Sequence, residues 1–381
     1  MRNVSIIGTG IIPFGKHRDV PIAELPRPAI RRAVIDSGAP ASSIQAAYCG
    51  TLYGGQAAGQ RVLAGLGMTG VPILNVENAC SSGSSAVREA YIAVAAGVYD
   101  VALAFGFDQL SAFGGGAIPL GFPDPEVDQG VIMPAVYAMR AQRHMADHGT
   151  TREQLAAVAV KNRRHAQHNP TAQFRDPITV DEVLGSRAIS DPLTLLQCCP
   201  TGDGAAAVVL AADDVASRYS ATPVRIRAAV LQSGVHSTDP RDMALSTLTV
   251  SAAALAYETA GLGADELDVI ELHDAFTIGE LMYYEALGLC PPGEGGRLID
   301  SGATRIGGKH PVNPSGGLLS KGHPVGATGA AQIVEVVNQL RGRCGARQVD
   351  GAQIGLAHAT GGGVSGFDHI ACTVHVLQRM A

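Results

Sequence analysis

The sequence contains no tryptophan, and aromatic residues make up only 4% of its 381 positions. Charged residues are also scarce: 28 Lys and Arg and 34 Asp and Glu amount to 16% of the chain and leave a net charge of −6. A nucleic-acid-binding protein needs a basic surface, and a disordered chain needs low hydrophobicity, whereas 46% of this chain is hydrophobic. The composition therefore excludes both classes and predicts a globular protein with a large core.

Paired cysteine motifs and long apolar runs are missing as well. The seven cysteines include no CxxC spacing, which argues against a disulfide scaffold and a zinc ribbon. The most apolar stretch, residues 91–105, is interrupted by Asp100 and is too short for a membrane span. The first residues lack the apolar segment of a signal peptide. We therefore expect a cytoplasmic protein, and its 47 glycines indicate many tight turns.

Short β-branched runs alternate with alanine-rich helical segments along the chain. The first cycle has predicted strands at 4–8, 46–50, 73–77, 101–105 and 205–211, with helices at 23–37 and 82–97. The second has strands at 224–230, 268–272, 353–358 and 367–375, with helices at 249–260, 275–287 and 326–340. Strands that are apolar on both faces are typical of a buried sheet covered by helices. Two cycles in similar order predict a duplicated α/β fold.

We place the boundary between the halves at residues 220 and 221, giving an N-terminal half of 1–220 and a C-terminal half of 221–381. Residues from about 114 to 196 differ in character, because most of the arginines and histidines and several polar helical segments lie there. This segment is predicted to be an inserted, more solvated loop subdomain.

Cys80 is the first candidate functional residue. A predicted strand ends at Glu77 and a helix begins at about Ser81 or Ser82, so Cys80 lies at a helix N-terminus. Free N–H groups and the helix dipole lower a thiol pKa at such a position, which favours a nucleophile. The alternative is a buried structural cysteine, the common state of a free cysteine. Cys198 and Cys199, which are adjacent to each other in the sequence, are predicted to be structural.

Three histidines follow strand ends or glycine-rich loops in the second cycle: His273, His323 and His358. Catalytic groups of α/β proteins gather at the carboxyl ends of the strands. Any one of these histidines could be a satisfied core residue. Together with Cys80 they predict a cysteine nucleophile with a histidine base.

Four segments resemble, in order, the motifs of the thiolase superfamily. They are NACSSG at 78–83, HDAF at 273–276, GHPVGATG at 322–329 and the glycines at 361–363. The HDAF form, with PTGDGAAA at 200–207, is most similar to the sterol-carrier-protein-type thiolases. The resemblance covers essentially the whole chain. It implies a duplicated five-layer αβαβα fold with an inserted loop subdomain, a homodimer, and acyl-coenzyme A as the substrate, with no covalently bound cofactor and no metal.

The resemblance also implies roles for the residues named above. Cys80 resembles the nucleophile that accepts the acyl group, and His323 resembles the base that activates it. His273 resembles a group of the oxyanion hole for the substrate thioester, and the N–H groups of Cys80 and Gly361 resemble a second hole. Thioester exchange requires a thiolate, a proton acceptor and such preorganised donors.

The sequence departs from the family pattern at the second catalytic cysteine. The two positions that hold this cysteine in thiolases are Ala275 and Ala359 here, and alanine cannot transfer a proton. The adjacent His358 is our candidate substitute. We expect an acyl-CoA C-acyltransferase of lipid metabolism that makes or cleaves a 3-oxoacyl-CoA.

Two alternatives remain open from the sequence. One is a thiolase-fold retro-aldolase or acyltransferase that acts with a small OB-fold, zinc-ribbon partner protein, and the other is a non-catalytic thiolase-like or lipid-binding subunit. Arg140, Arg143, Arg163 and Arg164 are candidates for binding the coenzyme A phosphates, although a solvated helix face is an equal explanation for them.

Overall fold

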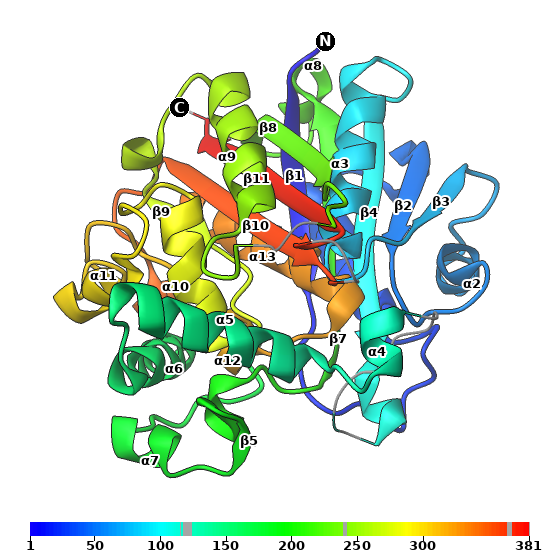
Figure 1. Cartoon of the computed structure of the whole chain (residues 1–381). Coiled ribbons are helices and arrows are strands. Elements are labelled where there is room, and N and C mark those ends of the chain that lie inside the picture. The colour runs from blue at the N-terminus through cyan, green and yellow to red at the C-terminus, as the bar shows by residue number, and fades with distance from the viewer. Residues whose placement is uncertain (115, 117–123, 239–241, 364–367, 381) are drawn as a thin grey trace.

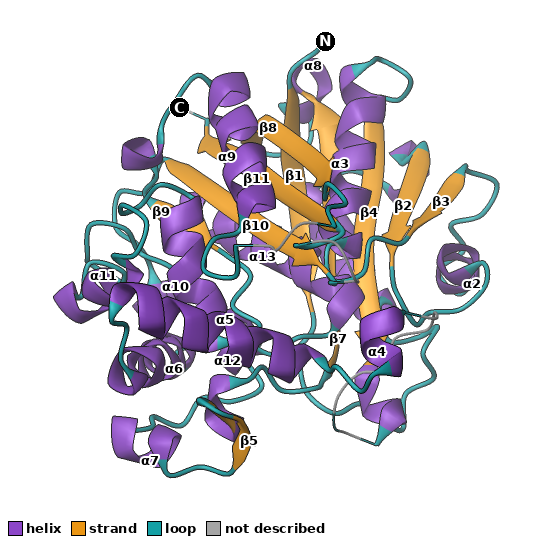
Figure 2. Cartoon of the chain, viewed as in Figure 1, coloured by secondary structure: helices purple, strands orange, loops and turns teal. Residues whose placement is uncertain are grey.

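One mixed sheet of nine strands runs through the molecule in the computed structural model, which describes residues 1–114, 116, 124–238, 242–363 and 368–380 (Figures 1 and 2). The strand order is β3-β2-β4-β7-β1-β8-β11-β10-β9. The strands of the first half are β1 (Val4–Ile11), β2 (Ala46–Gly50), β3 (Ile73–Val76), β4 (Val101–Gln109) and β7 (Asp203–Ala212). Those of the second half are β8 (Val224–Ser233), β9 (Val269–Glu271), β10 (Ile354–Gly361) and β11 (Ala371–Arg379). Phe367, where we predicted the last strand to begin, lies outside the described residues.

The two halves of the sheet repeat the same topology. In the first half β2 pairs in parallel with β3 and β4, and β7 is antiparallel to β4 and β1. In the second half β10 is parallel to β9 and antiparallel to β11, which is antiparallel to β8. A parallel bridge between Ile270 and Val312 takes the place of β3. The duplicated α/β fold is therefore confirmed. The exact boundary after residue 220 stays a prediction. The two halves form one sheet, in which β1 of the first half pairs with β8 of the second.

Helices and the two half-sheets form five layers. The helices α1 (Arg27–Ser37) and α2 (Ala58–Ala64) cover the first half-sheet, and α9 (Thr247–Ala260) and α10 (Thr277–Ala286) cover the second. Between the half-sheets lie α3 (Ser82–Ala95) and α13 (Val325–Leu340), which share one hydrophobic core with both (Figure 2). Since β4 and β7 are buried along their whole length, their residues are almost continuously apolar, as the sequence predicts.

The N-termini of the two middle helices, α3 and α13, lie close together. A Cβ atom at Gly83 of α3 would lie 2.4 Å from the carbonyl oxygen of Gly326 in α13, and one at Gly106 of β4 would lie 2.1 Å from that oxygen. No side chain fits at such distances, so glycine at these positions lets the helix N-termini approach each other. The loops that precede α3 and α13 are thereby brought together.

The described part of the inserted segment contains two long helices, two short helices and a small two-stranded sheet. Its elements are α4 (Pro125–Asp128), α5 (Met133–His148), α6 (Arg152–Ala166), α7 (Val180–Leu184), β5 (Ala188–Ser190) and β6 (Leu193–Thr194). The remaining helices are α8 (Asp213–Ala216), α11 (Gly295–Ser301) and α12 (Gly317–Lys321). The α6 helix packs against α10, α11 and α12, below the sheet in Figure 1.

The prediction of a more solvated subdomain does not hold for the inner side of α6. Lys161, Asn162, Arg163 and His165 are buried there. Lys161 forms an ion pair with the fully buried Glu280, and the Asn162 amide donates to the same carboxylate. Polar residues are buried here because they have hydrogen-bonding and charged partners.

Candidate active site

A tight turn presents Cys80 one residue before the N-cap of α3. Ala79 has a φ of 47°, a left-handed conformation that costs energy for a residue with a Cβ atom. The carboxylate of Glu77 accepts the Ala79 N–H at 2.6 Å and stabilises the turn. The thiol therefore projects from the strand-to-helix junction, and Cys80 is only partly exposed.

Two of the predicted histidines lie beside this thiol. Sγ of Cys80 and one ring nitrogen each of His273 and His323 all lie within 4.8 Å of one another. The two imidazole rings meet edge to face, with centroids 5.1 Å apart. A thiolate and two imidazoles are also donors that zinc accepts, and among the described residues this is the set with suitable spacing for a metal ion.

The hydrogen bonds of His323 define its tautomer. Its Nδ1 lies 2.8 Å from Oγ1 of Thr328, whose hydroxyl donates to the Pro324 carbonyl at 3.1 Å. Since that hydroxyl hydrogen is already used, Nδ1–H of the neutral imidazole donates to Oγ1. Nε2 then carries the lone pair that a general base requires.

Burial makes the uncharged forms of the thiol and the imidazole the stable ones. It raises the pKa of Cys80 to about 11, with Asp108 and Glu77 adding to the increase, although the N–H of Gly362 stabilises the thiolate. It lowers the pKa of His323 to about 4. The prediction of a lowered thiol pKa is wrong for the resting protein, because loss of hydration outweighs the favourable backbone N–H groups.

His273 is presented by the loop after β9, and the neighbouring Asp274 anchors this loop. The Asp274 carboxylate accepts the N–H groups of Leu318 and Leu319 in α12 at 2.7 and 3.3 Å and the Asn162 amide at 2.8 Å. Burial and the nearby imidazoles lower the pKa of His273 well below its ordinary range. The neutral ring can donate one hydrogen bond toward Cys80, as an oxyanion-hole group must.

His358 lies in a different network. Its Nδ1 accepts the His273 N–H at 3.5 Å and its Nε2 contacts Oγ1 of Thr249 at 3.1 Å, while its ring packs edge to face on Tyr283. The side chain is fully buried, and burial lowers its pKa to about 3. The geometry thus does not support our prediction that His358 carries the second proton. Side chains alternate along β10, so the side chains of His358 and of the next residue, Ala359, point to opposite faces of the sheet.

The glycines after β10 approach the nucleophile closely. A Cβ atom at Gly361 would lie 2.2 Å from the carbonyl oxygen of Asn78, so this position requires glycine. The N–H that stabilises the Cys80 thiolate belongs to Gly362, one residue beyond the predicted Gly361. The role of the Gly361 N–H in an oxyanion hole stays a prediction.

The four arginines proposed for phosphate binding lie in unlike environments. Arg140 is buried and forms an ion pair with Asp368, and Arg163 is buried with its guanidinium 5.1 Å from the ring centre of Phe174. Their burial argues against these two candidates. Arg143, paired with Asp147, and Arg164 are exposed.

Asp108 and Thr328 are site residues that sequence reasoning missed. Asp108 is fully buried and accepts hydrogen bonds from Thr51 and from the N–H groups of Leu52, Tyr53 and Gly326. Burial raises its pKa to about 6 despite these donors. It joins β4 to the start of α13 and so connects the two halves. Its signal in the sequence is an acidic residue at the end of an apolar strand.

Family models match both halves of the chain. The model described as "Thiolase, N-terminal domain" covers residues 4–214, and "Thiolase C-terminal domain-like" covers residues 229–374. The benzoylsuccinyl-CoA thiolase subunit BbsB of Thauera aromatica is 43% identical over 98% of both chains. The acetyl-CoA acetyltransferase of Methanothermobacter thermautotrophicus is 42% identical over 95% of this chain and 97% of its own.

Solved structures agree with this assignment. The Ltp2-ChsH2(DUF35) aldolase superposes with a TM-score of 0.85 at 26% identity, over 98% of this chain and 97% of that one. Human mitochondrial 3-ketoacyl-CoA thiolase has the same fold, with a TM-score of 0.77 at 18% identity over 100% and 99% of the two chains. None of the helices in the described part of the chain is long and apolar enough to cross a membrane. The chain belongs to the thiolase family and is an acyltransferase of the thiolase type.

Proposed function

We propose that the protein transfers an acyl group from acyl-coenzyme A to Cys80 and then makes or cleaves the carbon–carbon bond of a 3-oxoacyl-CoA. The observation that carries this proposal is the cluster of the Cys80 thiol with the His273 and His323 imidazoles, within 4.8 Å of one another. An uncharged thiol beside an uncharged base can react without prior ionisation in a buried site.

The acylation step uses the His323 lone pair. Nε2 of His323 takes the thiol proton as Sγ of Cys80 attacks the thioester carbonyl. The tetrahedral oxyanion accepts hydrogen bonds from backbone N–H groups. The candidate donors are the N–H of Cys80 and that of Gly361 or Gly362. The carbon–sulfur bond then breaks, and the departing coenzyme A thiolate takes the proton back from His323.

The carbon–carbon step uses the same cluster. Ala275 and Ala359 stand at the positions of the second thiolase cysteine and cannot accept a proton. After acylation His323 is neutral again and is the base for the Cα proton of a second acyl-CoA, while His273 donates to the enolate oxygen. The enolate carbon attacks the acyl carbonyl, the bond between the acyl group and Sγ breaks, and the Cys80 thiolate takes the proton back from His323. We assign His358 a positioning role, because its Nδ1 accepts the backbone N–H of His273.

Intact-protein mass spectrometry with acetyl-CoA tests the proposal. We expect one acetyl adduct that is absent in Cys80→Ala and retained in Cys290→Ala, a matched control at another partly exposed free cysteine. An adduct that persists in Cys80→Ala would contradict the assignment of the nucleophile. An adduct without any cleavage of 3-oxoacyl-CoA would remove the carbon–carbon step and leave acyl transfer.

A second candidate function is a retro-aldolase. It is favoured by Ala275 and Ala359 and by the similarity to a structure titled as an aldolase with a second, DUF35 component. In that case the chain acts with a small OB-fold, zinc-ribbon partner. Turnover of 3-oxoacyl-CoA by the purified chain alone would exclude a need for this partner.

We further propose a homodimer in a reducing, cytoplasmic compartment, acting in lipid metabolism. The short strand β3 is an edge of the sheet, and Leu74 within it is 48% exposed, so this edge is available for pairing with a second copy. All seven cysteines are free thiols. Sedimentation of the wild type and of Leu74→Lys tests the dimer, and a monomeric wild type would contradict it.

A further inference from the structure

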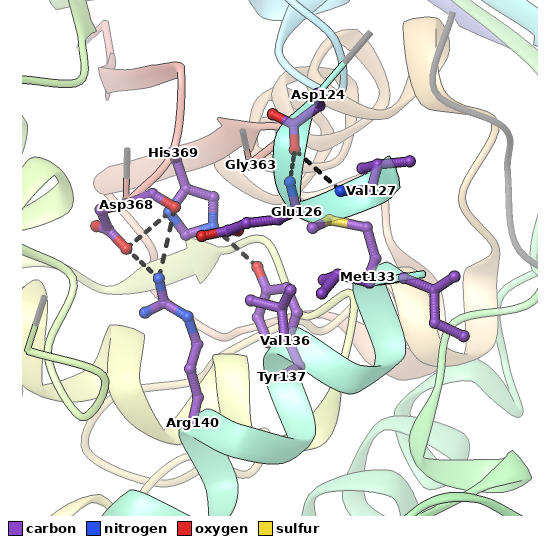
Figure 3. A pocket seen from close by; sticks show the side chains of 12 residues that line it. Asp124, Glu126, Val127, Met133, Val136, Tyr137, Arg140, Gly363, Asp368 and His369 are labelled. Carbon is purple, nitrogen blue, oxygen red and sulfur yellow. Dashed lines mark hydrogen bonds and ion pairs between the residues drawn. The ribbon is translucent and has the colours of Figure 1, made fainter. Parts of the chain in front are cut away.

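A small cavity lies beside the glycine loop that follows β10 (Figure 3). It has a volume of about 30 Å³. Its polar end is formed by Tyr137, Arg140, Asp368 and His369, and its apolar wall by Val127, Val131, Ile132, Met133 and Val136. Such a volume admits a group of one or two heavy atoms. Gly363, in the loop whose Gly362 N–H stabilises the Cys80 thiolate, is also part of the lining.

Two contacts connect this cavity to the candidate site. The Tyr137 ring stacks on Phe276, three residues after His273, with ring centroids 4.4 Å apart. Gly363 lines the cavity, and the N–H of the preceding Gly362 reaches the Cys80 sulfur. A group attached to Sγ of Cys80 can therefore extend toward the cavity.

Arg140 has unused hydrogen-bond donors at the polar end. Its side chain comes from α5 and is 1% exposed. Nη2 donates to the Asp368 carboxylate, but Nε and Nη1 are buried without a hydrogen-bond partner among the residues that the structure describes. Buried donors are rarely left unsatisfied, and those of a guanidinium are especially costly. Figure 3 shows Arg140 reaching from α5 toward Asp368 and His369, beside Tyr137.

Tyr137 and Asp368, at the same end of the cavity, already have hydrogen-bond partners. The Tyr137 hydroxyl bonds Nε2 of His369 at 2.9 Å, and Asp368 accepts the Ser246 hydroxyl at 2.8 Å. Among the described residues of the lining, Arg140 and His369 stand against three carboxyl groups, those of Asp124, Glu126 and Asp368. A carboxylate entering the cavity would meet this excess of negative charge, whereas a neutral oxygen would not.

We propose that this cavity binds the remote end of the acyl group carried by Cys80, and that Arg140 donates through Nε or Nη1 to a neutral carbonyl or hydroxyl oxygen there. The inference rests on the acyl transfer proposed above and adds the class of acyl group. The preferred substrates are oxygen-bearing acyl-CoA thioesters rather than plain alkyl or carboxylate-bearing ones.

Three acyl-CoA probes of similar length test this preference: pentanoyl-CoA, 4-oxopentanoyl-CoA and glutaryl-CoA. The measured quantity is the second-order rate constant for acylation of Cys80 by intact mass. We expect 4-oxopentanoyl-CoA to react about 10- to 100-fold faster than pentanoyl-CoA, the range for one hydrogen bond to a charged group. Glutaryl-CoA is expected to react more slowly than 4-oxopentanoyl-CoA.

The double variant Arg140→Met/Asp368→Leu removes both charges together, which avoids a lone buried carboxylate. We expect the 4-oxopentanoyl to pentanoyl ratio to fall to near unity in it, and to stay at the wild-type value in Gln142→Met, a control at an exposed position of the same helix. If the double variant does not fold, the ratio of the 4-oxopentanoyl to the pentanoyl rate in the wild type still tests the proposal.

The outcomes separate the two proposals. Equal rates for the 4-oxopentanoyl and pentanoyl probes in the wild type overturn the oxygen subsite while leaving acyl transfer intact. Faster acylation by glutaryl-CoA overturns the neutral-oxygen preference. No adduct from any acyl-CoA overturns the proposed function itself.

Discussion

Replacing Thr328 with valine removes the acceptor that defines the His323 tautomer. In the wild type, Nδ1–H of His323 donates to Oγ1 at 2.8 Å inside a fully buried site. Valine has nearly the same shape but cannot accept this bond. The Nδ1–H is then buried without a partner, which costs about 1–3 kcal/mol. The tautomer with its proton on Nε2 becomes the more stable one, and it cannot accept the Cys80 proton.

The same free energy gives the size of the kinetic effect. Populating the reactive tautomer against 1–3 kcal/mol slows acylation of Cys80 by about 5- to 150-fold. The assay is rapid mixing with acetyl-CoA followed by acid quench and intact mass. Because Thr328 touches the base and not the substrate, the fall is expected in the rate at saturating acetyl-CoA, with little change in its apparent affinity.

Thr328→Ser is the matched control, because it keeps the hydroxyl and loses only a methyl group. We expect it to retain most of the wild-type rate. If Thr328→Val acylates as fast as the wild type, Nε2 of His323 is not the proton acceptor. If valine and serine slow the reaction equally, the effect is one of packing and the tautomer argument is refuted.

Three further results are expected. Iodoacetamide alkylation of Cys80 should rise about tenfold per pH unit from pH 7 to 9.5 without a plateau, because burial raises its pKa to about 11; a plateau below pH 8 would indicate a thiolate–imidazolium pair. His358→Ala should slow 3-oxoacyl-CoA cleavage by displacing His273 yet leave the ionisations of its pH profile unchanged, and a lost ionisation would restore His358 as a proton carrier. Lys161→Met should lower the free energy of unfolding, measured by chemical denaturation, by about 3–5 kcal/mol, since it strands a buried carboxylate. Lys309→Met, at an exposed ion pair, should leave it nearly unchanged.

The fold was predictable because its signals are periodic and local. The continuous apolar residues of β4 and β7 indicate strands covered on both faces, and the order of elements indicates a duplication. The sequence did not reveal the buried face of α6. Lys161 and Asn162 look solvated in a helical pattern, and their partners in α10 are more than 100 residues away.

The candidate site was predictable in composition but not in orientation. Cys80, His273 and His323 all stand at strand or helix ends and do come together. His358 has the same sequence signal, but the pleat of β10 and a bond to Thr249 turn its ring elsewhere. The sign of the Cys80 pKa shift depends on how much water the folded chain removes, which no local pattern records.

The convergence of α3 and α13 divides the reaction between the two repeats. The two helices occupy equivalent positions in the two repeats. The first repeat carries the thiol of Cys80 just before α3, and the second carries the imidazole of His323 just before α13. A single repeat is therefore chemically incomplete, however well it folds. Two fragments separated in the turn between α8 and β8 would be inert apart and would regain reactivity only as they associate, so acylation of Cys80 would report on their assembly.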